Sequence, residues 1–334
     1  MSYGATERLE EQVDILVQDA SPSAIVQMSL LGAPAVPHLV KRLNEEETDG
    51  YGKVGPALPG HKAEAVSRAL GMIGHPAAIP VLAKLLQRAD DRSYRAPANA
   101  LRKIGTNEAL ETLVSRLDLF DPRHAVDTLE SFGDSGTRAA LRLVSEAKGK
   151  VQRVAMHVSV ARNPVESTPK LLQVLGSGEP TSRILAAGLL ASCTNVPAKP
   201  LMDAWQQSIK AEKAAAGYTN RLPEDERFAV REDYQRNVLA AIYFTQKAES
   251  VPEMLPTAAI ELEVGRTGRD SVLGIIACYG DKALRFLEGR SIESYPASLH
   301  AVCNHLAYRI RNNGLSYLAS KLEVAPSQRE HWAV

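Results

Sequence analysis

The sequence predicts an all-α fold, a right-handed α-solenoid built from antiparallel helix pairs. Three observations lead to this fold class. Apolar residues recur at the helical spacing i, i+3, i+4 and i+7 through most of the chain. Gly and Pro interrupt that spacing at matching positions. The resulting unit of two helices recurs about every 30 residues, which is typical of stacked helix pairs that share one continuous core.

The clearest helix pair spans residues 65–86, AVSRALGMIGHPAAIPVLAKLL. Gly74 is suited to end the first helix, and Pro76 cannot continue it. Pro80 falls in the first turn of the second helix, where its missing N–H costs nothing. Each helix carries one apolar face that it cannot bury alone, so the pair requires similar pairs on both sides. The two faces consist of Val66, Ala69, Leu70 and Ile73, and of Ile79, Leu82, Ala83 and Leu86.

The same pattern recurs before and after this pair. In the preceding unit Gly32 matches Gly74 and Pro37 matches Pro80, and in the following unit Gly105 takes the place of Gly74. Gly280 keeps the same phase much later in the chain. The units that we predict span residues 24–43, 65–86, 97–117, 128–144, 154–175, 182–205, 271–287 and 298–314.

We therefore divide the chain into regular repeats over residues 1–205 and less regular helical repeats over 206–324, followed by a flexible tail at 325–334. A segment rich in Gly and Pro at 44–62 interrupts the regular part and predicts a long loop. Such a loop is either functional or a plain surface excursion, and the sequence leaves both interpretations open.

The less regular part contains a long-helix insertion at 206–246. Pro223 is followed by three acidic residues, and this combination favours the N-terminus of a helix. We expect that helix to run to about Thr245.

Composition narrows the classes of function. Lys plus Arg and Asp plus Glu number 39 each, so net charge gives no indication of a nucleic-acid or acidic-membrane partner. The start of the chain is polar, and the longest apolar stretch, 184–191, is far shorter than the roughly 20 residues that span a bilayer. The sparse cysteines form no CxxC pattern and favour a reducing compartment. We expect a soluble cytoplasmic protein with no membrane partner; its cysteines are Cys193, Cys278 and Cys303.

The sequence shows no catalytic or metal-binding constellation. None of the eight histidines forms an HExxH motif, and His300 and His305 stand five residues apart, a poor spacing for one helical face. Residues 50–55 superficially resemble a phosphate loop, but they lack the GxxxxGK[ST] pattern and a preceding strand. The cysteines lie among apolar helical neighbours, which predicts buried core thiols. We therefore expect no enzymatic activity, no cofactor and no metal.

The candidate binding residues are basic side chains that recur midway along the predicted second helices. In such a solenoid the second helices line the concave surface, so these cations could form a positive stripe for an acidic protein segment or a phosphate backbone. The plainer interpretation, which the sequence alone favours, is that long cations merely solvate helix faces. The basic positions are Lys41, Lys84, Arg116, Arg142 and Lys170, and the 44–62 loop adds Tyr51 and Lys53 as contact candidates.

The segment ALGMIGHPAAIPVLAKLL resembles the HEAT-like repeat first described in phycobilin lyases. The unit at 97–117 resembles it too, with Arg102 in place of the middle glycine, and the C-terminal third fits poorly. The resemblance implies a HEAT-like solenoid, and most proteins that resemble this family are adaptors or assembly factors. It rests on Ala69, Leu70, Gly71, Ile73, Gly74, Pro76, Ala78, Pro80, Leu82, Leu85 and Leu86.

We thus expect a non-enzymatic scaffold that binds a helix or peptide segment of another protein in its concave groove. Two alternatives stay open, a bilin-lyase-like enzyme or chromophore chaperone and a HEAT-like nucleic-acid-binding protein. Neutral charge and the lack of interleaved aromatic residues disfavour nucleic acid. The iron-dependent hydroxylases with HEAT repeats carry paired His-Glu dipeptides, and this sequence contains none.

Overall fold

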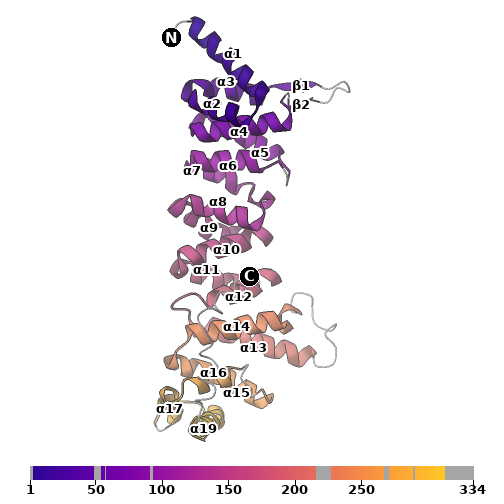
Figure 1. Ribbon diagram of the computed structural model, residues 1–334. Coiled ribbons are helices and arrows are strands. Elements are labelled where there is room, and N and C mark those ends of the chain that lie inside the picture. Colours follow the sequence, from indigo (N-terminus) through magenta and orange to yellow (C-terminus); the bar gives the residue numbers. More distant parts are fainter. Residues whose placement is uncertain are drawn as a thin grey trace. The chain divides into compact units, whose positions relative to one another are not determined.

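The computed structural model describes residues 3–48, 54–56, 58–90, 93–215, 227–266, 271–288 and 290–312, and these residues are mainly helical (Figure 1). They form two compact units, Met1–Ala140 and Leu141–Val334. The predicted all-α class of stacked antiparallel helix pairs is confirmed. The division at 205, which we based on repeat regularity, stays a prediction, and the tail at 325–334 lies outside the described residues.

The helices of the first unit form two layers. The first helices α2, α4 and α6 contact one another in sequence, as do the second helices α3, α5 and α7. This order follows from the repeat, because each pair buries its apolar faces against the next pair. The helices are α1 (Tyr3–Asp19), α2 (Pro22–Leu30), α3 (Val36–Asn44), α4 (Gly60–Ile73), α5 (Ile79–Arg88), α6 (Arg95–Ile104), α7 (Asn107–Val114), α8 (Pro122–Ser131) and the start of α9 (Gly133–Glu146), with 3-10 turns η1 (Ala33–Ala35), η2 (Pro76–Ala78) and η3 (Leu117–Leu119).

The turn between the helices of a pair repeats in detail. Gly74 and Gly105 both end a first helix with φ of +71°, a conformation that favours glycine. In the pair that contains Gly74, and in the pair before it, a short 3-10 turn leads into the second helix. The first turn of that helix contains Pro80 in the one pair and Pro37 in the other. The predicted phase of the repeat is therefore confirmed. The other glycines in that phase, Gly32, Gly133 and Gly280, also have positive φ.

The insertion between α3 and α4 is only partly a loop. Strands β1 (Glu46–Thr48) and β2 (Val54–Pro56) pair antiparallel, with Glu47 opposite Gly55 (Figure 1). The insertion ends where α4 begins, at Gly60. The expectation of a loop throughout 44–62 is therefore wrong, because strands of three residues are too short to show a period of two in the sequence.

The helices of the second unit also form two layers. Helices α10, α12, α14 and α16 contact one another in sequence, as do α11, α13 and α15. The paired arrangement thus continues where the sequence pattern is weak. The helices are the end of α9, α10 (Gly149–Arg162), α11 (Pro164–Ser177), α12 (Pro180–Leu190), α13 (Ala198–Ala215), α14 (Glu232–Thr245), α15 (Val251–Glu263), α16 (Val272–Cys278), α17 (Asp281–Leu287), α18 (Arg290–Glu293) and α19 (Ala297–Asn312), with 3-10 turns η5 (Arg227–Val230) and η6 (Ala248–Ser250).

The helix predicted from Pro223 to Thr245 starts later than expected. Arg231 is extended, with φ −71° and ψ 134°, and α14 begins at Glu232. Glu232 and Asp233 are the acidic residues in the first turn of α14, a role that the sequence analysis gives to the three acidic residues after Pro223. Pro223 itself lies outside the described residues.

An aromatic cluster joins α6 to α8 in the first unit. The rings of Tyr94 and Phe120 stack at 4.8 Å, and the ring of His124 stands edge-on to both, at 5.5 and 5.2 Å. The hydroxyl of Tyr94 donates to Asp121 at 2.9 Å. Asp121 in turn caps α8 by accepting from the backbone N–H of His124 at 2.9 Å. The imidazole Nε2 of His124 is buried and has no hydrogen-bond partner among the described residues.

This burial predicts a pH dependence of stability. Burial lowers the pKa of His124, with Arg102 and Arg95 acting in the same direction and Asp121 and Asp127 opposing it. The unfolded chain then binds a proton more readily than the folded one. We therefore expect the free energy of unfolding to fall as pH drops below about 6.5, the ordinary histidine pKa.

The substitution His124→Phe keeps the ring packing and removes the proton site, so it should flatten that fall between about pH 7.5 and pH 5. Denaturant unfolding at several pH values measures this slope. His61→Phe, at an exposed position on α4, is the matched control and should leave the slope as it is. Equal slopes for both variants would contradict the assignment to His124.

Candidate protein-binding face

The candidate face is the layer of second helices, and the predicted basic residues are distributed over both units. In the first unit Lys41 lies on α3 and Lys84 on α5, and Arg116 follows the end of α7. In the second unit Arg142 lies on α9 and Lys170 on α11. The five basic residues are therefore divided between the two units and do not form one cluster within either of them. Tyr51 and Lys53, the contact candidates of the insertion, lie outside the described residues.

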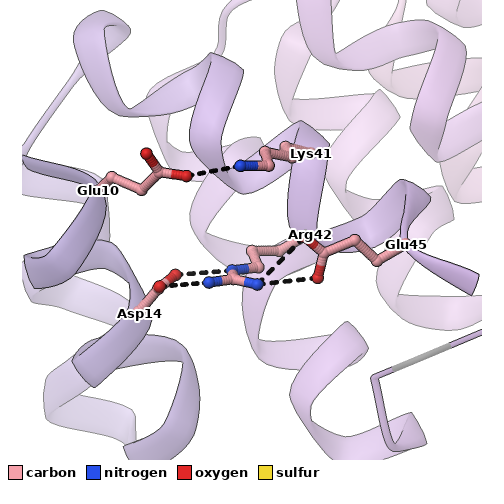
Figure 2. A network of polar contacts seen from close by, with 5 residues as sticks. All are labelled: Glu10, Asp14, Lys41, Arg42 and Glu45. Atoms are coloured by element: carbon pink, nitrogen blue, oxygen red, sulfur yellow. Dashed lines mark hydrogen bonds and ion pairs between the residues drawn. The ribbon is translucent and has the colours of Figure 1, made fainter. Parts of the chain in front are cut away.

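Lys41 and its neighbour Arg42 bind the N-terminal helix α1 (Figure 2). The Nζ of Lys41 donates to Glu10 at 2.7 Å. Arg42 holds both carboxylate oxygens of Asp14, with 2.6 Å from its Nε to Oδ1, and it also donates to Glu45 at 2.9 Å. Bidentate pairing of this kind fixes orientation as well as distance. These contacts anchor α1 to α3.

The contacts of this network shift the pKa of Glu10, Lys41 and Arg42. The hydrogen bond from Lys41 lowers the pKa of Glu10, and the same bond raises the pKa of Lys41. Hydrogen bonds to Asp14 and Glu45 raise the pKa of Arg42. The side chain of Lys41 remains 61% exposed, so its charge still faces solvent. Exposed pairs contribute little to stability, and the network chiefly defines where α1 sits.

Arg116 has a structural role in the first unit. Its Nη1 donates to the backbone carbonyls of Leu86 and Gln87, at 3.1 and 2.6 Å, in the last turn of α5. The carbonyl of Leu86 also accepts from the backbone N–H of Ala89 at 3.3 Å, and Arg116 adds a side-chain donor at this end of the helix, so it caps α5. The prediction that Arg116 lies midway along a helix is wrong, because α7 ends at Val114. Its guanidinium is directed at the preceding repeat.

Lys170 forms a similar link in the second unit. Its Nζ donates to the hydroxyl of Ser145 on α9 at 2.9 Å. Arg142 lies 3.6 Å from Glu146, one turn along the same helix, and 42% of its side chain is exposed. Arg116 and Lys170 thus each contact a helix of the preceding pair, and Lys41 contacts α1, the helix that precedes its own pair. Both interpretations of the sequence placed these cations in solvent, and neither anticipated that they join successive repeats.

The second unit contains a buried carboxylate that the sequence analysis missed. Glu261 on α15 is 0% exposed and accepts from the indole Nε1 of Trp205 at 2.6 Å. It also accepts from the backbone N–H groups of Val272 and Leu273, at 2.9 and 2.8 Å, at the start of α16. Burial raises the pKa of Glu261, and these donors oppose that effect. The carboxylate joins three helices and caps α16.

Arg266 completes the surroundings of Glu261. Its guanidinium lies 4.6 Å from the centroid of the Trp205 ring and donates to Glu212 on α13 at 2.9 Å. A signal for this cluster was present in the sequence, because Glu261 continues the stripe of Met254 and Ala258 at i+4 and i+7. A carboxylate in an otherwise apolar stripe indicates a buried and specifically paired group.

Two further observations bear on the class of protein. Among the residues that the structure describes, no group of three or more His, Cys, Asp or Glu side chains is arranged to hold a metal ion. No single described helix is long and apolar enough to cross a membrane, and the segments Pro22–Leu30 and Ala33–Asn44 reach that length and apolarity only as a pair bent by 105°.

Comparison with known proteins agrees with the repeat architecture. The HEAT-repeat family matches residues 57–124, the part of the chain with the clearest predicted pairs. HEAT repeats generally act as scaffolds for protein–protein contacts and are typically non-enzymatic. A search of curated proteins finds no match. A crystal structure of an engineered protein shares 16% identity over 98% of this chain and 93% of its own, with a TM-score of 0.35.

Proposed function

We propose that this protein is a non-catalytic cytoplasmic scaffold, an adaptor or assembly factor, that holds a partner protein against its second helices. The observation that carries the proposal is the ladder of α3, α5 and α7 in the first unit, much of which lies within the segment that matches HEAT repeats. A row of parallel helix faces offers a continuous surface, which suits a helix or an extended peptide segment.

Charge indicates which segment would suit this surface. Lys41 and Lys84 both follow the first-turn proline of their helix by four residues, so a positive charge stands at the same position in these two repeats. An acidic partner segment would complement these positive charges. We expect the second helices to line a concave face, as in the phycobilin-lyase type of repeat. The insertion would add Tyr51 and Lys53, and Arg142 and Lys170 would contribute from the second unit.

Charge reversal on α5 tests this proposal. Lys84→Glu should weaken binding of the partner protein about 3–10-fold, because it places a repulsive charge on the proposed face. Arg68→Glu is the matched control, since Arg68 lies on the first helix α4 with 58% of its side chain exposed. It should leave the affinity unchanged. Titration of the purified partner, followed by fluorescence anisotropy, measures both values.

The comparison of the two variants decides whether the second helices form the binding face. Equal affinity for Lys84→Glu and the native protein would contradict it. Circular dichroism and unfolding of each variant must first match the native protein. The bilin-lyase-like and nucleic-acid alternatives predict different results. A coloured adduct after co-expression with a bilin would favour the first, and a steep loss of affinity for nucleic acid with salt would favour the second.

A further inference from the structure

Helix α1, the first helix that the structure describes, packs on a surface formed by α2, α3 and α4, which we call its seat. It contacts α2, α3 and α4, and its apolar side is buried there, with Val13 0% and Val17 1% exposed. Its polar contacts include the pairs of Glu10 with Lys41 and of Asp14 with Arg42 (Figure 2), and Lys62 on α4 donates to Gln18. All of these contacts join α1 to residues that lie after Ala20 and Ser21, the two residues that connect α1 to α2.

That link is short and strained. Only Ala20 and Ser21 separate α1 from α2, and Ala20 has φ of +48°. Residues with a Cβ avoid this region, whereas glycine accepts it. Ser21 caps α2 by accepting from the N–H of Ala24 at 3.2 Å, and Pro22 begins that helix. Ser21 and Pro22 are therefore held in place at the start of α2. The strained backbone conformation is at Ala20, and it allows α1 to pack against its own chain.

We propose that the seat of α1 also accepts α1 from a second copy of this chain, which gives a dimer with two exchanged N-terminal helices. Each exchanged helix forms the same contacts as in the monomer, so exchange sacrifices none of them. Opening the link frees Ala20 to leave the positive-φ region. Short strained hinges are known to favour such exchange. Figure 1 shows α1 at the N-terminal end of the first unit.

Complementary charge changes test the exchange directly. One variant carries Glu10→Lys with Asp14→Lys, and the other carries Lys41→Glu with Arg42→Glu. In each variant α1 meets like charges on its own chain, whereas in a mixed pair both seats are matched. We expect native mass spectrometry of the mixture to show the mixed dimer in at least tenfold excess over either dimer of one variant. Monomers alone in the mixture would overturn the proposal.

A matched pair of substitutions at the hinge gives an independent readout without altering the seat. Ala20→Val makes positive φ costlier and should raise the dimer fraction about tenfold at equal concentration. Ala20→Gly relieves the strain in the monomer and should lower that fraction below the native value. Light scattering after size-exclusion chromatography measures both. Equal dimer fractions in the two variants would overturn the proposal.

Discussion

Glu261→Gln should lower the free energy of unfolding of the second unit by about 2–4 kcal/mol. The carboxylate accepts three N–H donors, one from Trp205 and two from the start of α16. An amide offers one oxygen, and its NH₂ group would face a donor in a site without access to water. Oε1 accepts from two of these donors and Oε2 from one, so at least one buried donor would then lack an acceptor. A buried donor without an acceptor costs far more than the loss of an exposed hydrogen bond.

Denaturant unfolding gives the total effect, and amide hydrogen exchange locates it. We expect faster exchange in α15 and α16 and little change in the first unit. Glu263→Gln is the matched control, because Glu263 lies two residues away on the same helix with its side chain exposed. It should change stability by less than about 0.5 kcal/mol. Equal effects of the two substitutions would contradict the structural role of Glu261.

Gly71→Ala should destabilise the first unit by about 1–3 kcal/mol, although alanine is the better helix former. Helices α4 and α6 approach so closely that a Cβ on Gly71 would lie 2.6 Å from the Cα of Ala100. The obstacle is the backbone of the neighbouring helix rather than a movable side chain. The two first helices would therefore have to separate, and the apolar contacts beside them would loosen.

The same substitution at Gly176 is expected to have the opposite sign. Gly176 lies within α11, and a Cβ there would meet nothing within 4 Å. Alanine should thus stabilise the second unit by about 0.5–1 kcal/mol through the lower entropy of the unfolded chain. Thermal and denaturant unfolding of both variants measures the contrast. A stabilising effect of Gly71→Ala would show that α4 and α6 do not approach as closely as described.

The repeat could be predicted from sequence because its signals are local. Gly74 and Pro80 restrict the backbone at their own positions, and the apolar stripes have a period that the sequence shows directly. One further copy of the signal was overlooked. Pro252 follows Val251 as Pro80 follows Ile79, and the 3-10 turn η6 precedes that helix just as η2 precedes α5.

The roles of the polar residues could not be predicted in the same way, because each depends on a partner far along the chain. Arg116 reaches carbonyls 29 and 30 residues away, and Glu261 meets Trp205 across 56 residues. A basic residue that recurs once per repeat has the same sequence pattern whether it binds a partner or joins two repeats. Only the fold distinguishes these roles, and for Arg116 it shows the second.

Site-specific photo-crosslinking during affinity capture tests whether the second helices form the binding face. A photoreactive residue in place of Gln87, exposed on α5 one turn after Lys84, probes the second-helix layer. The same residue in place of Gln27, exposed on α2, probes the first-helix layer. Capture from an extract of the native cells, after nuclease treatment, is read by mass spectrometry. We expect one protein to crosslink from position 87 and not from position 27, and Lys84→Glu to reduce the yield of this crosslink. Crosslinks of equal yield from both positions would contradict this expectation. So would a protein that is captured without nuclease treatment but lost after it.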